Sequence, residues 1–301
     1  MVSGKGNKTV IVVMGPTASG KTAVAIELAK FLKTEIISAD SRQCFKEMKI
    51  GVARPTEEEL NTVPHYFIAT HYVTDEMNAA LFEQYALKKT GELFDKYKTI
   101  VMVGGTGLYI KAFCEGMDDI PSINSEIRNK ILLNYEQNGL EWLQAQVNEK
   151  DPGFFAAGEN QNPQRLMRAL EVIESTGQSI LSYRKGKNKE RKFSIIKIGL
   201  ELPKEELHLN INSRVDKMFE QGLVEEVKNL LPFKDLNALQ TVGYKELFDF
   251  IEEKISLQKA IEKIKNNTRK YAKRQLTWFR KDEKIKWVMP GDFKKIKEAL
   301  M

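Results

Sequence analysis

The 301-residue sequence has few cysteines, few histidines and no long hydrophobic run. The two cysteines, Cys44 and Cys114, are too few for a disulfide framework or a four-ligand zinc site. The three histidines, His65, His71 and His208, share no spacing that is typical of metal ligands. No apolar run approaches the roughly 18 residues of a membrane-spanning helix. The first residues also lack an apolar stretch long enough for a secretory signal, so we expect a cytoplasmic protein without a membrane segment.

Positive charge is concentrated in two segments of the chain. The formal net charge is +6, but residues 263–286 alone carry +8 and residues 184–192 carry +5, which leaves −7 on all other residues. Concentrated positive charge favours a polyanionic partner. In 263–286 the apolar positions follow a helical stripe and the basic residues lie on the other faces. A basic helix face that contacts only solvent is the alternative explanation.

Strand-like and helix-like segments alternate in the first part of the sequence. Short β-branched runs predict buried strands at 9–14, 35–38 and 99–103, and apolar spacing predicts helices at 21–33 and 78–97. Such alternation is typical of right-handed crossover connections and a parallel sheet.

The pattern changes after residue 120. Segments 125–137, 139–148 and 163–175 have helical periodicity, and a strand is expected again at 193–200, followed by a mostly helical region at 204–279. In the third of these helices, Asn162 is expected as the N-cap and Pro163 as the first residue. We predict a core formed by residues 1–120 and 193–301, which includes the basic C-terminal helix, and a helical insertion at 121–192. Residues 116–122 and 186–191 are the candidate linkers.

A phosphate-binding motif lies between the first predicted strand and the first predicted helix. It matches G-x-x-x-x-G-K-[ST]. In this motif the backbone N–H groups surround a phosphate chain, the lysine adds a positive charge, and the hydroxyl of the last residue, here Thr22, can bind Mg²⁺. The motif specifies an anion, so a diphosphate fits as well as a nucleotide. Its residues are Gly15, Pro16, Thr17, Ala18, Ser19, Gly20, Lys21 and Thr22. We therefore predict an α/β fold with a P-loop NTPase-like parallel sheet flanked by helices, and an inserted helical domain.

Two further strand ends carry candidate site residues. Asp40 follows the second strand, at the sheet edge where open α/β folds bind ligands, and it is either a general base or a helix N-cap. The third strand ends in Gly104-Gly105-Thr106-Gly107 without a carboxylate, which disfavours nucleotide hydrolysis as the main activity. These glycines either allow close approach of a ligand beside Thr106 or form an ordinary left-handed turn.

Together these motifs resemble those of the tRNA dimethylallyltransferases, also called tRNA isopentenyltransferases, in their compact bacterial form. The matching segments are GPTASGKT at 15–22, ISADSRQ at 37–43, IGVARP at 50–55, VPHY at 63–66, GGTGLY at 104–109, NPQRLMRALEV at 162–172, VGY at 242–244 and KRQLTWFR at 273–280. They span nearly the whole chain. Cys44, Phe45, Glu47 and Val52 depart from the usual pattern of the family.

The resemblance implies transfer of a dimethylallyl group from dimethylallyl diphosphate, with Mg²⁺, to the exocyclic amine of the adenosine 3′-adjacent to the tRNA anticodon. It implies catalytic roles for Asp40, as general base, and Thr106, and diphosphate binding by the P-loop and Arg214. Contacts with the tRNA anticodon arm are implied for Asp40, Ser41, Arg42, Gln43, Thr106, Arg128, Gln164, Arg165, Leu166, Met167, Arg168, Lys273, Arg274, Gln275, Leu276, Thr277, Trp278, Phe279 and Arg280.

Two other functions share part of this pattern, and we expect a monomer in each case. A small-molecule kinase would use the P-loop and Asp40 but would not need the basic segment or the glycine-rich strand end. A nucleotide-switched RNA-binding module would use the P-loop and the basic helix, whereas Asp40 would be dispensable.

Overall fold

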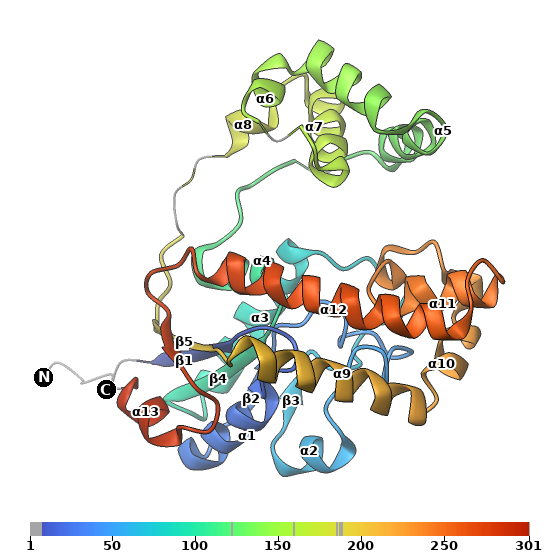
Figure 1. Cartoon of the computed structure of the whole chain (residues 1–301). Coiled ribbons are helices and arrows are strands. Elements are labelled where there is room, and N and C mark those ends of the chain that lie inside the picture. Colours follow the sequence, from blue (N-terminus) through green and yellow to red (C-terminus); the bar gives the residue numbers. More distant parts are fainter. Residues whose placement is uncertain (1–7, 122, 159, 185, 187–188, 301) are drawn as a thin grey trace, which may run out of the picture. The chain divides into compact units, whose positions relative to one another are not determined.

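The computed structural model describes residues 8–121, 123–158, 160–184, 186 and 189–300 (Figure 1). The chain divides into two compact units. One, the sheet unit, consists of residues 1–116 and 190–301, and the other, the helical unit, consists of residues 117–189. The boundaries of 121 and 192 that we expected from sequence lie a few residues further along the chain.

A parallel sheet of six strands forms the centre of the sheet unit. The strand order is β3-β2-β4-β1-β5-β6, and every neighbouring pair is parallel. The strands are β1 (Thr9–Met14), β2 (Ile36–Ser38), β3 (His65–Tyr66), β4 (Thr99–Gly104), β5 (Ser194–Leu200) and β6 (Lys286–Val288). The predicted α/β fold is thereby confirmed, and the two short strands β3 and β6 are additions to it.

The central strand β1 is buried on both faces, which explains its unbroken apolar sequence. Val10 and Val12 are fully buried, and Ile11 and Val13 belong to the apolar cluster between the sheet and α1 (Lys21–Leu32). Burial on both faces is typical of a parallel sheet that helices cover on each side. The carboxyl ends of β1, β2 and β4 therefore meet at one edge of the sheet.

Helices lie between the strands in the chain and follow the last long strand, as predicted. Their bounds are α2 (Glu57–Thr62), α3 (Ala79–Phe94), α4 (Gly107–Glu115), α9 (Lys204–Glu220), α10 (Leu223–Asn229), α11 (Tyr244–Ile251), α12 (Leu257–Phe279) and α13 (Phe293–Glu298), with short 3₁₀ turns η1 (Leu231–Phe233) and η2 (Asn237–Leu239). The long helix α12 packs against α9, α11 and α4 (Figure 1). The region 204–279, predicted to be mostly helical, thus packs on itself and on α4.

The helical unit is formed by α5 (Ser125–Lys150), α6 (Pro152–Ala156), α7 (Pro163–Thr176) and α8 (Ile180–Tyr183). Gly139 interrupts α5 with φ 74° and ψ −167°, at the position where two separate helices were predicted. The side chain of Asn162 caps α7 by accepting hydrogen bonds from the N–H groups of Gln164 (3.0 Å) and Arg165 (3.3 Å), as expected. A separate apolar core confirms that this unit buries its own helix faces.

None of the described helices combines the length and the apolar character that a membrane span requires. Cys44 and Cys114 are both buried and are not joined to each other.

Candidate active site

A cavity of about 1120 Å³ lies in the sheet unit, at the carboxyl ends of the strands. The P-loop, the segment from Asp40 to Gln43 and the glycines that follow β4 line one side of it. Side chains from α9 and α12 line the other side, among them Arg214, Tyr271 and Arg274. Basic groups outnumber acidic ones in this lining: Lys21, Arg42, Arg214, Lys245, Lys263, Lys270 and Arg274 against Asp40, Glu59, Glu246 and Asp249. The cavity thus suits an anionic ligand.

Two side chains from the C-terminal part of the chain hold the P-loop. Gln275 of α12 accepts a hydrogen bond from the Thr17 N–H (2.8 Å) and donates one to the Gly105 carbonyl (2.8 Å). The Arg214 guanidinium of α9 donates to the Thr17 hydroxyl (2.9 Å). Arg214, which was predicted to contact the diphosphate, thus lies beside the P-loop. Gln275 links the loops that follow β1 and β4.

Ser19 also has the features of a ligand-binding group. Its hydroxyl is buried and forms no hydrogen bond with any described residue, although Ser19 lines the cavity. Because a buried hydroxyl without a partner is unfavourable by about 1–3 kcal/mol, this position favours a ligand that supplies oxygen atoms.

Lys21 has an unusually acidic ammonium group. Burial, with the nearby Arg214 charge as the second cause, lowers the pKa of Lys21 to about 7, and Asp40 opposes the shift. The ammonium donates a hydrogen bond to the Pro16 carbonyl (2.6 Å). Burial also lowers the pKa of Arg214. An anion placed between these two cations would stabilise both charges.

Asp40 occupies the cavity edge after β2 and also shapes the local backbone. Its Oδ1 accepts hydrogen bonds from the N–H groups of Arg42 (2.9 Å) and Gln43 (3.2 Å). Its Oδ2 has no hydrogen-bond partner among the described residues. The alternative of a helix N-cap is wrong, because residues 41–44 form a turn and the next helix, α2, begins at Glu57. Oδ1 holds that turn, and the second oxygen remains available to a ligand. Burial and the nearby Asp40 carboxylate raise the pKa of Tyr271 to about 12, so that its hydroxyl stays protonated.

Thr106 connects the ends of β4 and β2. Its hydroxyl accepts a hydrogen bond from the Ser41 N–H (3.0 Å) and lies 3.3 Å from the Ser41 hydroxyl. It therefore holds the residue next to Asp40. The alternative of a left-handed turn at residues 104–107 is wrong, because none of these glycines has a positive φ. A Cβ at Gly104 would lie 2.2 Å from the Ala39 carbonyl oxygen, and one at Gly107 would lie 2.3 Å from the Trp278 ring. Close packing within the protein requires these glycines.

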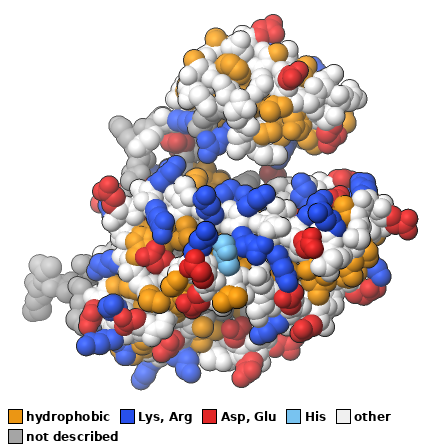
Figure 2. Space-filling model, in the orientation of Figure 1, with side chains coloured by type: hydrophobic (Ala, Val, Ile, Leu, Met, Phe, Trp, Pro, Cys, Tyr) orange, Lys and Arg blue, Asp and Glu red, His pale blue; other side chains and the backbone are white. Residues whose placement is uncertain are grey.

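Basic residues of α12 differ in their surroundings. Lys265 pairs with Asp216 (2.6 Å), Arg269 donates to Asn212 and Asn266, and Arg280 pairs with Glu201 (3.2 Å). In the described part of the chain, Lys270 and Lys273 form no ion pair. Figure 2 shows Lys and Arg side chains gathered on the face of the sheet unit along which α12 runs. The positive face is therefore only partly neutralised by the protein itself.

Not all of the predicted contacts in segment 273–280 fit this surface. Lys273, Arg274, Thr277, Trp278 and Arg280 are exposed. Phe279 is buried, and so is Gln275, which is occupied by the P-loop. Leu276 packs partly into an apolar cluster. The side chains of Phe279 and Gln275 point into the protein, and contact of this segment with RNA stays a prediction.

The helical unit holds the remaining predicted RNA contacts. Gln164 and Arg165 are exposed on the first turn of α7, whereas Arg168 and Arg128 both pair with Glu171, at 3.1 and 3.8 Å. Leu166 and Met167 were also predicted to contact tRNA, but both are buried in the core of this unit. Their side chains belong to the apolar stripe of α7, and contact of this segment with tRNA stays a prediction.

Three basic residues of the second basic segment, residues 184–192, have partners within the protein. Arg191 donates to the Glu83 carboxylate (2.7 Å) and to the carbonyls of Ala112 and Phe113. Lys189 pairs with Asp119 (2.9 Å), and the Arg184 guanidinium lies 5.4 Å from the centre of the Phe154 ring. Residues 185, 187 and 188 lie outside the described residues. Arg191 has a structural role, at the end of α4.

The fold and the site define a P-loop α/β protein whose cavity is suited to a phosphorylated ligand. Residues 43–282 match the family model described as IPP transferase. Over most of its length the chain is also similar to tRNA dimethylallyltransferases. It is 46% identical to that of Cytophaga hutchinsonii, over 96% of this chain and 95% of the relative. It is 50% identical to that of Christiangramia forsetii, over 91% of each. The chain therefore belongs to the IPP transferase family.

Solved structures show the same similarity in three dimensions. The tRNA isopentenylpyrophosphate transferase of Bacillus halodurans has a TM-score of 0.71 and 34% identity, over 97% of this chain and 95% of that one. A eukaryotic dimethylallyltransferase described as acting on tRNA has a TM-score of 0.77 and 25% identity, over 97% of this chain and 76% of that one. The predicted family and fold class are confirmed.

Proposed function

We propose that this protein is a cytoplasmic, monomeric tRNA dimethylallyltransferase. It transfers the dimethylallyl group of dimethylallyl diphosphate to the exocyclic amine of the adenosine 3′-adjacent to the anticodon. The observation that carries the proposal is that one cavity joins a P-loop with two partly buried cations, Lys21 and Arg214, to the carboxylate of Asp40. The relatives are named for this activity, and the small-molecule kinase is not favoured.

Diphosphate departure is the first requirement of the reaction. Negative charge develops on the leaving oxygen as the allylic C–O bond breaks, so cations aimed at that position lower the barrier. Lys21 and Arg214 lie where they can stabilise this charge, and Ser19 offers a hydroxyl to the phosphate oxygens. These groups bind the donor and hold its diphosphate during bond cleavage.

Acceptor activation is the second requirement. The adenine amine is a weak nucleophile because its lone pair is delocalised into the ring, and loss of a proton as the new bond forms assists it. Oδ2 of Asp40 can accept that proton, while Oδ1 holds the turn at Arg42 and Gln43. General-base catalysis of this kind typically contributes about 10²–10⁴-fold.

Magnesium is a suitable partner of the bound diphosphate. Mg²⁺ prefers oxygen ligands and is usually held by phosphate oxygens, waters and one or two protein oxygens. Thr22 would supply its hydroxyl, and the unpartnered Ser19 hydroxyl adds an oxygen to the same loop. The ion would neutralise diphosphate charge. The residues present therefore fit Mg²⁺.

The tRNA would bind along the partly neutralised face of α12. Lys270, Lys273 and Arg274 are available there for phosphate contacts. An adenosine in the anticodon loop must leave its stack to reach the cavity, which costs a few kcal/mol. Contacts with the splayed loop would offset that cost.

The proposal is tested with dimethylallyl diphosphate, Mg²⁺ and an anticodon stem-loop. We expect one five-carbon unit to be added to a single adenosine, as measured by mass spectrometry. Asp40→Asn should lower the rate by about 10²–10⁴-fold, because asparagine keeps the Oδ1 acceptor but cannot take the proton. Asp235→Asn, at an exposed position, is the matched control. An unmodified RNA, or an Asp40→Asn variant as active as the wild type, would overturn the proposal.

A further inference from the structure

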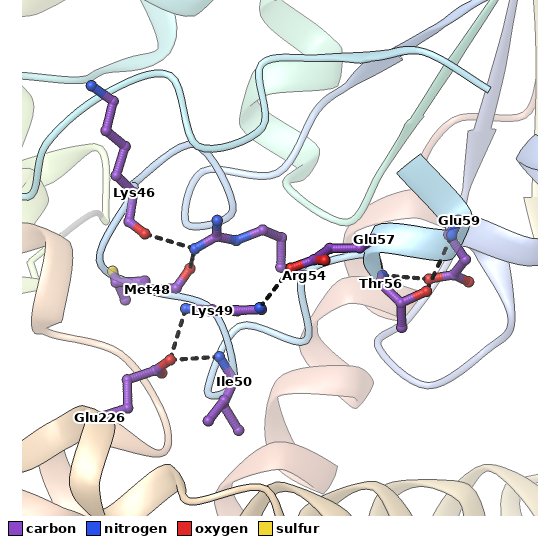
Figure 3. A network of polar contacts seen from close by, with 9 residues as sticks. All are labelled: Lys46, Met48, Lys49, Ile50, Arg54, Thr56, Glu57, Glu59 and Glu226. Atoms are coloured by element: carbon purple, nitrogen blue, oxygen red, sulfur yellow. Dashed lines mark hydrogen bonds and ion pairs between the residues drawn. The ribbon is translucent and has the colours of Figure 1, made fainter. Parts of the chain in front are cut away.

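One acidic side chain outside the cavity lining, Glu226 of α10, is surrounded by donors from a distant loop. Its Oε2 accepts hydrogen bonds from the N–H groups of Lys49 (2.9 Å) and Ile50 (2.7 Å), and its Oε1 accepts one from the Gly51 N–H (2.9 Å). Figure 3 shows the carboxylate pointing at the first two of these. Three consecutive backbone donors on one carboxylate fix the loop in a single arrangement.

A buried tyrosine completes this contact. The Tyr244 hydroxyl donates to the same Glu226 carboxylate (2.7 Å), and its side chain is fully buried. The loop lies so close to the ring that a Cβ at Gly51 would be 2.6 Å from it. Glu226 and Tyr244 therefore hold residues 49–51 from two sides, and Gly51 is required for that approach.

The opposite side of the same loop is held by Arg54. Its guanidinium donates to the carbonyls of Lys46 (2.8 Å) and Met48 (2.7 Å), which closes the loop on itself (Figure 3). Gly51, Val52, Ala53 and Pro55 line the cavity. The loop is thus one wall of the candidate active site, and its position depends on α10.

The loop is connected to Asp40 by a chain of hydrogen bonds. The Gln43 side chain donates to the carbonyls of Val52 (3.2 Å) and Ala53 (3.0 Å). The Gln43 backbone N–H in turn donates to Oδ1 of Asp40 (3.2 Å). A displacement of residues 49–53 would therefore reach Gln43 and then the turn that orients the Asp40 carboxylate.

We propose that Glu226 is a positioning residue for the acceptor half of the reaction. It fixes the loop at residues 49–53, which holds Gln43 and through it the orientation of Asp40. The inference rests on the proposed function. None of these contacts includes the P-loop, so the donor half of the site should be independent of Glu226.

The matched test uses two neighbouring glutamates on α10. Glu226→Gln replaces one acceptor oxygen by an NH₂ group that faces backbone donors. Glu225→Gln makes the same change of charge at an exposed position whose partner is Lys228 (3.3 Å). Because a misplacement of about 1 Å can lower a rate 10²-fold, we expect Glu226→Gln to lower kcat by about 10- to 100-fold. The KM for dimethylallyl diphosphate should stay within about twofold of that of Glu225→Gln, which should behave as the wild type.

A double variant separates positioning from general loss of stability. If Glu226 acts through Gln43, then Glu226→Gln combined with Gln43→Ala should be no slower than the slower single variant, because coupled residues are not additive. Tyr244→Phe removes one of the four donors and should lower kcat in the same direction by a smaller factor. It also serves as the test if Glu226→Gln fails to fold.

Three results would overturn the inference: equal kcat for the two glutamate variants, an equal loss in donor binding and kcat, or multiplicative losses in the double variant. Failure of the proposed function is distinguishable, because then the wild type itself adds no five-carbon unit to the stem-loop.

Discussion

The pKa of Lys21 predicts that donor binding depends on pH in a specific way. Burial, then Arg214, lowers this pKa to about 7, so most of the ligand-free protein carries a neutral Lys21 at pH 8 and above. The diphosphate favours the ammonium, and binding above pH 7 must therefore include uptake of a proton. Each pH unit above the pKa of Lys21 weakens donor binding by about tenfold, or about 1.4 kcal/mol. At pH 9, about two units above the pKa, the affinity should therefore be about 100-fold below that of the protein with a protonated Lys21.

The assay is calorimetric titration with dimethylallyl diphosphate at fixed Mg²⁺, without RNA, between about pH 7.5 and 9.5, where phosphate groups with a second pKa near 6 are already ionised. Two buffers of different ionisation enthalpy report the number of protons taken up. Lys21→Met, which has no titratable group, should bind more weakly at pH 7.5 and lose the slope. A wild-type affinity that stays constant over this range would refute the reasoning.

The lowered pKa of Lys21 affects donor affinity and folding stability in opposite directions as pH rises. Between pH 7 and 10.5 the unfolded chain binds more protons at Lys21 than the folded one, so the ligand-free protein should become more stable as pH rises through this window.

Two further predictions concern stability. Gln275→Ala leaves the Thr17 N–H and the Gly105 carbonyl without their partner, so it should lower the free energy of unfolding by about 2–4 kcal/mol, as measured by urea denaturation. Thr277→Ala, at an exposed position of the same helix, is the control. A loss of stability as small as that of the control would contradict the bridging role of Gln275. Leu170→Ala opens a cavity in the core of the helical unit and should cost about 2–5 kcal/mol, whereas Leu133→Ala, 57% exposed, should have little effect. Donor binding should survive both leucine substitutions, and its loss would show that the sheet unit does not bind the donor by itself.

Local sequence determined how much of the fold could be predicted. The strands β1, β2, β4 and β5 were predicted to within about a residue, because their β-branched runs are buried whatever the rest of the chain does. The break at Gly139 was also predicted from local sequence, because 125–137 and 139–148 were identified as two separate helical segments. The strands β3 and β6 have two and three residues, too few for any periodicity, and they exist through pairing with β2 and β5.

The site divides in the same way. The P-loop and Asp40 lie in contiguous motifs at strand ends, so their place at the sheet edge followed from the sequence. Gln275 was predicted as part of the tRNA-contacting segment. Its partner Thr17 lies 258 residues away, and no pattern in the chain indicates their contact. No motif or spacing in the sequence indicated a role for Glu226. Only the close approach at Gly51 and Tyr244, visible in three dimensions, shows why a carboxylate is needed there.

The link between Gln275 and Thr17 also has a consequence for the order of synthesis. The P-loop leaves the ribosome before α12, because it precedes Gln275 by 258 residues. At about 5–20 residues per second, the 258 residues between Thr17 and Gln275 take about 13–50 seconds to make. During the first part of that time β1 also lacks its neighbour β5, which follows the helical unit in sequence. The helical unit, a contiguous segment, can fold first. Gln275 can therefore hold the P-loop only after α12 has been made, 258 residues later than the loop itself.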